Sequence, residues 1–473
     1  MQTLSTNLRE NMDFFQSYFQ IDMAFDLISR PLIIAGTQAN LYFIDGLVKD
    51  DIIQRLMEYF VYVSPKEMTN SPQELSNRLL PYGSVAILTN METISKNLLS
   101  GLSILLVDGF DVAFSIDCRS YPARGVQEPE KDKVMRGSKD GFVETLTCNT
   151  ALIRRRIRSP KLRMEIFAVG DVTKTDVVIS YLDDRVDKKL LNDIRTRIQN
   201  IKIEALSMNQ ESLVECLYRR TWINPFPKYK FTERPDTVCA SLLEGNIIIL
   251  VDNSPSAIIL PTSIFDIIEE ADDYYFPPVT GTYLRFSRFI TNIVALLLTP
   301  TFLLLLNHPQ WIPAPLYFIT ITDDINVLPI IQFLILEFCI DGLRLAALNT
   351  PSMLSTPLSI VAGIVLGDFT VTSGWFNSEC MLYMAFVSIA TYSQASFELG
   401  YALKFMRILL LIVTQLFGII GFVLGVIFVF MLILTNHTIS EDSFVYPLIP
   451  LHKNALLRTI FRVSLPTSEK RKH

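Results

Sequence analysis

The pattern of hydrophobic residues changes well past the midpoint of the chain. Residues 1–285 alternate short apolar segments with polar turns, at spacings that are typical of strands and helices. From Phe289 onward, long apolar runs are interrupted by Pro and Gly. An apolar run of about 20 residues is long enough to cross a bilayer as a helix. The sequence therefore predicts an α/β soluble half followed by an all-α polytopic membrane domain.

The soluble half contains two pairs of similar stretches. LLSGLSILLVDGFDVAFSI begins at Leu98 and LLEGNIIILVDNSPSAIIL begins at Leu242, and each predicts a Gly-capped helix end, a strand, a turn and a second strand. Upstream, FIDGLVKDDIIQRL from Phe43 parallels YLDDRVDKKLLNDI from Tyr181. Two linked similarities in the same order indicate a duplication with a period of roughly 140 residues, far longer than a solenoid repeat.

These similarities divide the soluble half. We expect two related α/β subdomains at residues 22–118 and 165–285, with the repeated part of the second ending near residue 262, behind an N-terminal segment at 1–21. Residues 119–164 begin with Pro, Gly and charged residues, as a linker does. This linker ends in a basic cluster, which is either a solvated or salt-bridged face or a contact patch for anionic lipid or an acidic partner. The cluster consists of Arg154, Arg155, Arg156, Arg158, Lys161 and Arg163, and its first four arginines form the expected contact patch.

The second half contains several candidate membrane spans. Four long apolar runs lie at residues 290–306, 325–348, 355–371 and 408–434. Arg285 and Arg288 precede the first run, so the positive-inside rule predicts that it starts in the cytoplasm. A fifth run, 381–395, is short and is either a span or a re-entrant segment. The glycines of the last run indicate close packing against another helix, at Gly418, Gly421 and Gly425.

The side of the membrane on which the tail lies decides whether 381–395 is a span or a re-entrant segment. The tail at residues 437–473 is basic, which favours the cytoplasm. We therefore predict four full spans and a re-entrant 381–395 within a membrane domain at 286–436. In that topology Lys404 and Arg407 need anionic lipid or a nearby acid such as Glu398.

One predicted span carries a polar stripe. On a helix, Glu337, Asp341 and Arg344 lie at positions i, i+4 and i+7 and share a face, to which Asn326 also belongs. Charges in hydrocarbon are costly, so the stripe faces either another helix, in a salt-bridged seam, or a water-filled path. In the seam, Asp341 is expected to pair with Arg344 of the same helix or with Arg344 of a neighbour. The outer end of the same predicted helix carries Asp323 and Asp324.

Composition narrows the function classes. The 473 residues have a formal net charge of −6 and no aromatic-rich basic motif, so nucleic-acid binding is not expected. The six cysteines form no CxxC pair and no zinc spacing, which predicts free thiols and no metal site. The sequence shows no Gly-rich phosphate loop, zincin motif, nucleophile elbow or signal peptide. We expect a protein that is not an enzyme, uses no cofactor and keeps its soluble half in the cytoplasm.

Several segments are similar to one family. RGVQEPEKDKVMRGSKDGFVETLTCNTALIRRRIRSPKLRME, from Arg124, closely resembles a signature of the GerA-type spore germination proteins, the A subunits of germinant receptors. ERPDTVCASLLEGNIIILVDNSPSAIILP, DDYYFPPVTGTYLRFSRFI and LNTPSMLSTPLSIVAGIVLG are also similar to this family. LGDFTVTSGWFNSECMLYMA and FELGYALKFMRILLLIVTQLFG resemble its stage V sporulation protein AF branch, as do the membrane acids Asp368 and Glu398.

The resemblance implies a multi-pass protein of the spore inner membrane, in contact with lipid, with a cytoplasmic α/β half. It implies a homo-oligomeric ring, expected to be a pentamer, around a pore for monovalent cations, and a partner membrane protein. Rings of acids select cations, so in such a ring Glu337 is the expected selectivity residue, with Asp341 held by Arg344.

Three functions follow from the resemblance. The first is an A-subunit-like component of an ion-conducting complex that releases cations, or amplifies their release, during germination. The second is a nutrient-sensing germinant receptor A subunit. The third is a non-conducting scaffold of the dipicolinate-release machinery.

Overall fold

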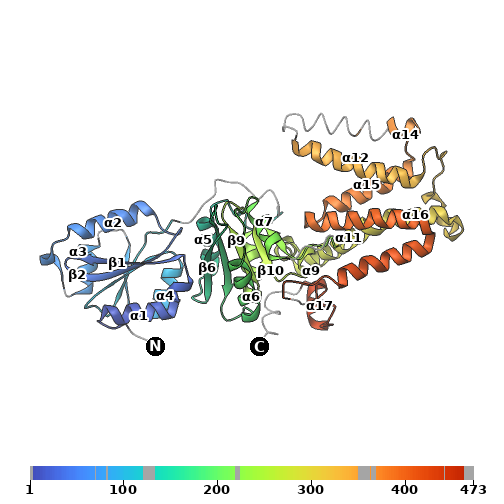
Figure 1. The fold of residues 1–473 in the computed structure, drawn as a ribbon. Coiled ribbons are helices and arrows are strands. Elements are labelled where there is room, and N and C mark those ends of the chain that lie inside the picture. Colours follow the sequence, from blue (N-terminus) through green and yellow to red (C-terminus); the bar gives the residue numbers. More distant parts are fainter. Residues whose placement is uncertain are drawn as a thin grey trace. The chain divides into compact units, whose positions relative to one another are not determined.

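The computed structural model divides the chain into two compact units, shown in Figure 1. The α/β unit comprises Met1–Arg220 with Tyr229–Pro261, and the helical unit comprises Thr221–Lys228 with Thr262–His473. The residues that the structure describes are 4–69, 71–80, 84–120, 134–218, 224–349, 363, 369–440 and 443–462.

The α/β unit contains two five-stranded antiparallel sheets with the same strand order. The first runs β1-β2-β4-β5-β3 and the second β6-β7-β9-β10-β8, so β4 and β9 hold the same central place. The first sheet consists of β1 (Leu27–Ile34), β2 (Thr37–Ile44), β3 (Val85–Leu88), β4 (Ser103–Val107) and β5 (Ala113–Ile116). The second consists of β6 (Leu162–Val169), β7 (Thr175–Leu182), β8 (Lys230–Thr232), β9 (Ile247–Val251) and β10 (Ala257–Leu260).

Helices cover both faces of the first sheet. Leu105 of β4 packs with α2 (Asp50–Tyr62) and α3 (Pro72–Leu79), whereas Ile104 and Leu106 pack with α1 (Leu8–Phe19) and α4 (Met91–Leu99). Figure 1 shows these two pairs of helices on opposite sides of the sheet. Successive side chains of a strand point to opposite faces, so a strand between two helical layers is apolar throughout. The helices of the second subdomain are α5 (Leu146–Arg156), α6 (Lys188–Gln199), α7 (Asn209–Leu217) and α8 (Pro235–Glu244).

The duplication includes the helix that precedes each stretch of similar sequence, because the same side-chain hydrogen bonds occur at α1 and at α5. Asn11 of α1 exchanges two side-chain hydrogen bonds, of 2.8 and 2.6 Å, with the backbone six residues earlier, and Asn149 of α5 does the same at the same distances. The first backbone amide of each helix bonds the turn carboxylate of its own subdomain, Asp108 or Asp252. The predicted N-terminal segment and the end of the predicted linker are therefore parts of the subdomains.

Arg154, predicted to lie on an exposed basic patch, is buried between the subdomains. Its Nε pairs with Asp26 Oδ2 at 2.9 Å, both side chains are 2% exposed, and its Nη1 donates to the carbonyl of Leu162. The prediction of a surface patch is wrong for this residue because it neutralises a buried acid. Arg156 lies at the surface and pairs with Asp140 at 3.4 Å. The other two members of the patch, Arg155 and Arg158, are half-exposed and exposed.

Replacing Arg154 with Met should destabilise the α/β unit by about 3–5 kcal/mol, because the change strands the carboxylate of Asp26 in the interior. The measurement is thermal unfolding of the purified chain in detergent, with Arg158→Met as the control. Equal unfolding midpoints for the two variants would contradict a structural role for the buried pair.

The helical unit contains two helices that are long and apolar enough to cross a membrane, among the residues that the structure describes: α11 (Pro278–Asn307) and α16 (Phe397–Leu434). The predicted second span is α12 (Pro329–Asn349), which starts later than expected and carries three charged residues. The shorter helices are α9 (Ile264–Ile268), α10 (Asp272–Tyr275), α14 (Thr370–Thr372), α15 (Ser378–Tyr392) and α17 (Lys453–Ile460).

Helix α15 runs beside α12 in the same direction. At one end Gln332 donates to Asn377 (Nε2–Oδ1 2.7 Å), and at the other the guanidinium of Arg344 lies 4.9 Å from the ring centroid of Tyr392. The region predicted as a re-entrant segment, 381–395, therefore follows α12 from end to end instead of turning back.

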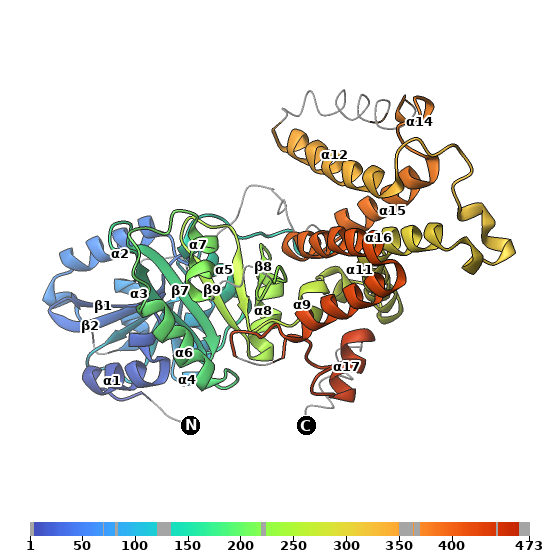
Figure 2. The same cartoon turned by 45° about the vertical axis from the view of Figure 1, so that its right-hand side comes forward.

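The last apolar run is a helical hairpin. Gly418 has φ 58° and ψ −136°, and Figures 1 and 2 show α16 reversing into two antiparallel arms. Side chains would not fit between the arms: a Cβ on Gly425 would lie 2.6 Å from Leu410, and one on Gly421 would lie 2.2 Å from the carbonyl oxygen of Val413. The predicted single span over 408–434 is therefore wrong, and its glycines pack against the other arm of the same run.

The described part of the tail lies beside the start of α11. Arg285 Nη1 donates to the carbonyls of Arg458 and Thr459 at 2.8 and 2.9 Å. The start of α11 and the described tail thus lie at the same end of the helical unit. The reversal of direction that we predicted at 381–395 occurs at Gly418 instead. The predicted span 355–371 falls outside the described part of the chain except for residues 363 and 369–371, and Asp368 and residues 463–473 also lie outside it.

Cysteine labelling tests this arrangement. In intact cells a membrane-impermeant maleimide should label a cysteine at Thr322, beyond the far end of α11, but not one at Asn454 of α17. The exposed native Cys216 is an internal control and should react only after lysis. Labelling at Asn454 without lysis would place the two ends of the helical unit on opposite sides.

Candidate functional site

Two helices of the helical unit meet at a group of charged side chains, which we call the charged seam. It consists of Glu337 and Asp341 of α12 with Lys404 and Arg407 of α16. Spacings of four residues on α12 and three on α16 put each pair on one helical face. The first arm of α16 runs antiparallel to α12, so Glu337 meets Arg407 while Asp341 meets Lys404.

Glu337 is at the centre of the charged seam and is buried, with 3% of its surface exposed. Its Oε1 lies 2.6 Å from Arg407 Nε, and its Oε2 lies 3.5 Å from Lys404 Nζ. Arg407 also donates to the carbonyl of Ala295, so the seam includes the backbone of α11. Removing one partner of a buried ion pair lowers the stability of the fold strongly, because the remaining charge is left without a partner and without solvation by water.

Asp341 is the accessible acid of the charged seam, with a side chain 38% exposed, and it pairs with Lys404. It borders a cavity of about 20 Å³, enough for roughly one water molecule. The charged residues that line the cavity are Glu337, Asp341, Arg344, Lys404 and Arg407. Two acids and three bases give a net charge of +1. The prediction that Glu337 faces a hydrated cation path is therefore not met within this chain, where its carboxylate is ion-paired and buried.

Arg344 does not take the role predicted for it. Its guanidinium lies over the rings of Tyr392, Phe397 and Tyr401, at 4.9, 5.8 and 5.3 Å from the centroids. Such cation–π contacts hold a cation in an apolar setting without a carboxylate. The expected pair with Asp341 is wrong because α16 supplies Lys404 to that acid instead.

The other predicted site residues lie away from the charged seam. Asn326 precedes α12 and donates to the carbonyl of Gly374 at 3.2 Å, so it is not on the polar face of the helix. Asp323 and Asp324 are exposed in the loop before α12. Glu398 lies in the first turn of α16, where it accepts from the capping residue Ser396 and where a negative charge favours the helix. These residues are not brought together with Glu337.

Sequence reasoning missed the partners in the charged seam. Lys404 and Arg407 were recognised as needing a negative partner, and the spacing of Glu337 and Asp341 matches theirs in reverse. That complementarity was the available signal. A second missed contact joins Gln332, which is fully buried, to Asn377 through two hydrogen bonds of 2.7 and 2.9 Å.

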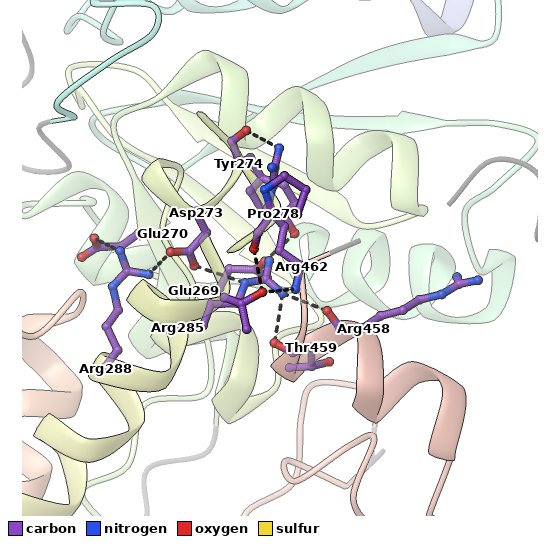
Figure 3. A network of polar contacts seen from close by, with 11 residues as sticks. Glu269, Glu270, Asp273, Tyr274, Pro278, Arg285, Arg288, Arg458, Thr459 and Arg462 are labelled. Atoms are coloured by element: carbon purple, nitrogen blue, oxygen red, sulfur yellow. Dashed lines mark hydrogen bonds and ion pairs between the residues drawn. The ribbon is translucent and has the colours of Figure 1, made fainter. Parts of the chain in front are cut away.

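A second charged network surrounds the start of α11 and is drawn in Figure 3. Arg288 pairs with Glu270 at 2.8 Å and with Asp273, while Arg285 pairs with Glu269. Burial raises the pKa of the Asp273 carboxyl above its ordinary value, and Arg288 is the main opposing influence. The two arginines that mark the predicted cytoplasmic end of α11 are thus neutralised by the segment around α10.

The fold and the site together define a class of protein in which a repeated α/β unit is followed by apolar helices that enclose buried ion pairs. The family model described as Bacillus/Clostridium GerA spore germination protein matches residues 13–473. The chain therefore belongs to the GerA family of spore germination proteins.

Individual relatives cover nearly the whole chain. It is 34% identical to stage V sporulation protein AF of Bacillus subtilis (strain 168), over 98% of this chain and 94% of that protein. It is 27% identical to spore germination protein KA of the same organism, over 96% and 84%. Among solved structures, it is similar to the N-terminal domain of the A subunit of the Bacillus megaterium germinant receptor GerK3. That match has 29% identity and a TM-score of 0.43, over 55% of this chain and 96% of that one.

The charged seam predicts a non-additive mutational result. Arg407→Met should lower stability by about 3–5 kcal/mol because Glu337 loses its closest partner, whereas the double variant Glu337→Gln with Arg407→Met should recover most of that loss. Thermal unfolding in detergent measures both, with Lys453→Met as a surface control. Additive losses in the double variant would show that the two side chains act independently.

Proposed function

We propose that this chain is a polytopic protein of the spore inner membrane and the A-subunit-like component of an ion-conducting complex. In this role it releases cations, or amplifies their release, during spore germination. The exposed acidic pair Asp323 and Asp324, in a chain of the GerA family, carries the proposal, because acidic groups at the mouth of a path raise the local concentration of cations. The names of the relatives, a sporulation protein and a germination protein, support the same process.

The proposed orientation puts the α/β unit in the cytoplasm. The support is the basic pair Arg285 and Arg288 at the start of α11, together with the basic residues of the tail beside it. In this orientation the turn at Gly418 and the loop that carries Asp323 and Asp324 face the other side of the membrane.

We assign the cation path to the space between copies of the chain rather than to the charged seam. The seam is buried, ion-paired and bordered by a net positive charge, which repels cations. Its proposed task is to hold α11, α12 and α16 in the closed arrangement. The proposed assembly is a homo-oligomeric ring, expected to be a pentamer, with a partner membrane protein. Asp323 and Asp324 then concentrate monovalent cations at the mouth of the path.

Cation flux from vesicles that contain this chain and its partner membrane protein tests the proposal. The double variant Asp323→Asn with Asp324→Asn should lower potassium flux by up to about ten-fold at low ionic strength and less at high salt, because surface charge is screened. Oligomer size, measured by cross-linking, should not change. Asp50→Asn with Asp51→Asn is a matched control that removes two exposed acids from the first turn of α2 in the α/β unit.

The other functions predict different outcomes of the same assay. Absence of flux above that of empty vesicles would favour the non-conducting scaffold. Flux that requires an added nutrient would favour the receptor subunit. Unchanged flux in the Asp323 and Asp324 variant would remove these residues from the path.

A further inference from the structure

The residues that follow the helical hairpin expose several large apolar side chains, although the segment lies against a charged network. Six of them are between 43% and 56% exposed: Tyr446, Leu448, Ile449, Leu451, Leu457 and Phe461. Residues 443–462 also contain three basic residues and no acid. Exposed apolar patches of this kind mark interaction surfaces.

The same segment is fixed beside the first turns of α11. The backbone amide of Arg462 donates to Thr282 Oγ1 at 3.2 Å, and its Nη2 donates to the carbonyl of Tyr274 at 2.6 Å. Gly281 permits this approach, because a Cβ there would lie 2.7 Å from Arg462 Cδ. Contacts from Arg285 to two carbonyls of the α17 region complete the attachment.

This attachment sets the level of α17 relative to the apolar part of α11. The long apolar run of α11 begins at Phe289, one residue after Arg288, and the contacts to α17 come from residues 281–285. Helix α17 is therefore held about one turn before the point where α11 becomes apolar, which is the level of the lipid headgroups if α11 spans.

Apolar and basic side chains are arranged on α17 as on an interfacial helix. Lys453 and Leu457 lie at positions i and i+4 on its exposed face, and Phe461, which is also exposed, follows directly after the last residue of the helix. Figure 3 shows the side chain of Arg458 pointing away from the charged network, while its carbonyl accepts from Arg285. A helix with this composition buries its apolar residues at the acyl boundary and keeps its cations among the phosphates.

We infer that residues 446–461 form an interfacial anchor that binds the anionic lipid surface, with Leu457 and Phe461 inserted and Lys453 and Arg458 at the phosphates. Lipid is the occupant that the observations favour, because the face lies at the membrane level of α11 and combines exposed apolar groups with positive charge. The inference rests on the proposed membrane location of α11 and α12 but not on ion conduction.

Lipid quenching of a fluorescent label on single cysteines tests the anchor in proteoliposomes of the full chain. The label is attached at Leu457 or Phe461, in a chain whose native cysteines are replaced. Phe338→Cys, on the exposed side of α12, is the lipid-facing reference, and Met208→Cys, in the α/β unit, is the solvent-facing reference. Nitroxide lipids carry the quencher either near the headgroup or deep in the acyl chain, and iodide is the aqueous quencher.

We expect the shallow lipid quencher to quench the labels at Leu457 and Phe461 strongly, by at least half of the lipid quenching measured at Phe338. Both labels should also be protected from iodide. Iodide quenching equal to that at Met208 would overturn the anchor. Protection from both lipid and iodide would also overturn it, because the face would then be covered by protein, such as a second copy. Failure of Phe338 itself to be quenched would instead contradict the proposed membrane span.

The charge requirement is tested in vesicles of phosphatidylcholine with and without phosphatidylglycerol. Lipid quenching at Leu457 should fall several-fold in the neutral vesicles and in high salt, because charge attraction to the lipid surface is then lost or screened. The double variant Lys453→Gln with Arg458→Gln should show little dependence on lipid charge. Equal quenching of the unmodified segment in both kinds of vesicle would overturn the anionic specificity.

Discussion

The ion pair between Glu337 and Arg407 is the contact on which the arrangement of the helical unit depends. In surroundings of low dielectric constant, neither charge is tolerated without the other. Since the two residues lie on different helices, their pairing fixes the rotation and register of α12 against the first arm of α16. Arg407 also bonds a carbonyl of α11. One guanidinium therefore sets the relative positions of three helices, and Lys404 beside it adds a second constraint on the same register.

In the α/β unit, the sequence was sufficient to predict two related sheets, because β4 and β9 repeat both their apolar pattern and their turn aspartate. The helices before the sheets were missed because their repeat is carried by single polar residues. Asn11 and Asn149 have the same bonding pattern, but the apolar residues around them differ. Arg154 was misjudged for a related reason: a run of arginines resembles a surface patch, and its buried partner Asp26 is distant in the sequence.

In the helical unit, the polar stripe on α12 was predicted, with a salt-bridged seam as one of two alternatives for its environment, but its partners were not predicted. Helical spacing shows that Glu337 and Asp341 share a face. It does not show which of the other helices supplies the opposite charge. The reversal at Gly418 was hidden for a different reason, since a glycine is common in membrane helices and only its backbone angles reveal a turn. Local pattern identifies the elements, whereas pairing between them depends on tertiary structure.

The separation of the paired charges along the chain has a consequence for synthesis. Lys404 and Arg407 follow Glu337 by 67 and 70 residues, so α12 is made well before the cations that neutralise it. During that interval an unpaired carboxylate on α12 disfavours release into lipid. In the proposed membrane topology, insertion of α12 into the bilayer is therefore coupled to the arrival of α16, and a chain truncated before the hairpin is expected to contain a helix that the membrane does not retain.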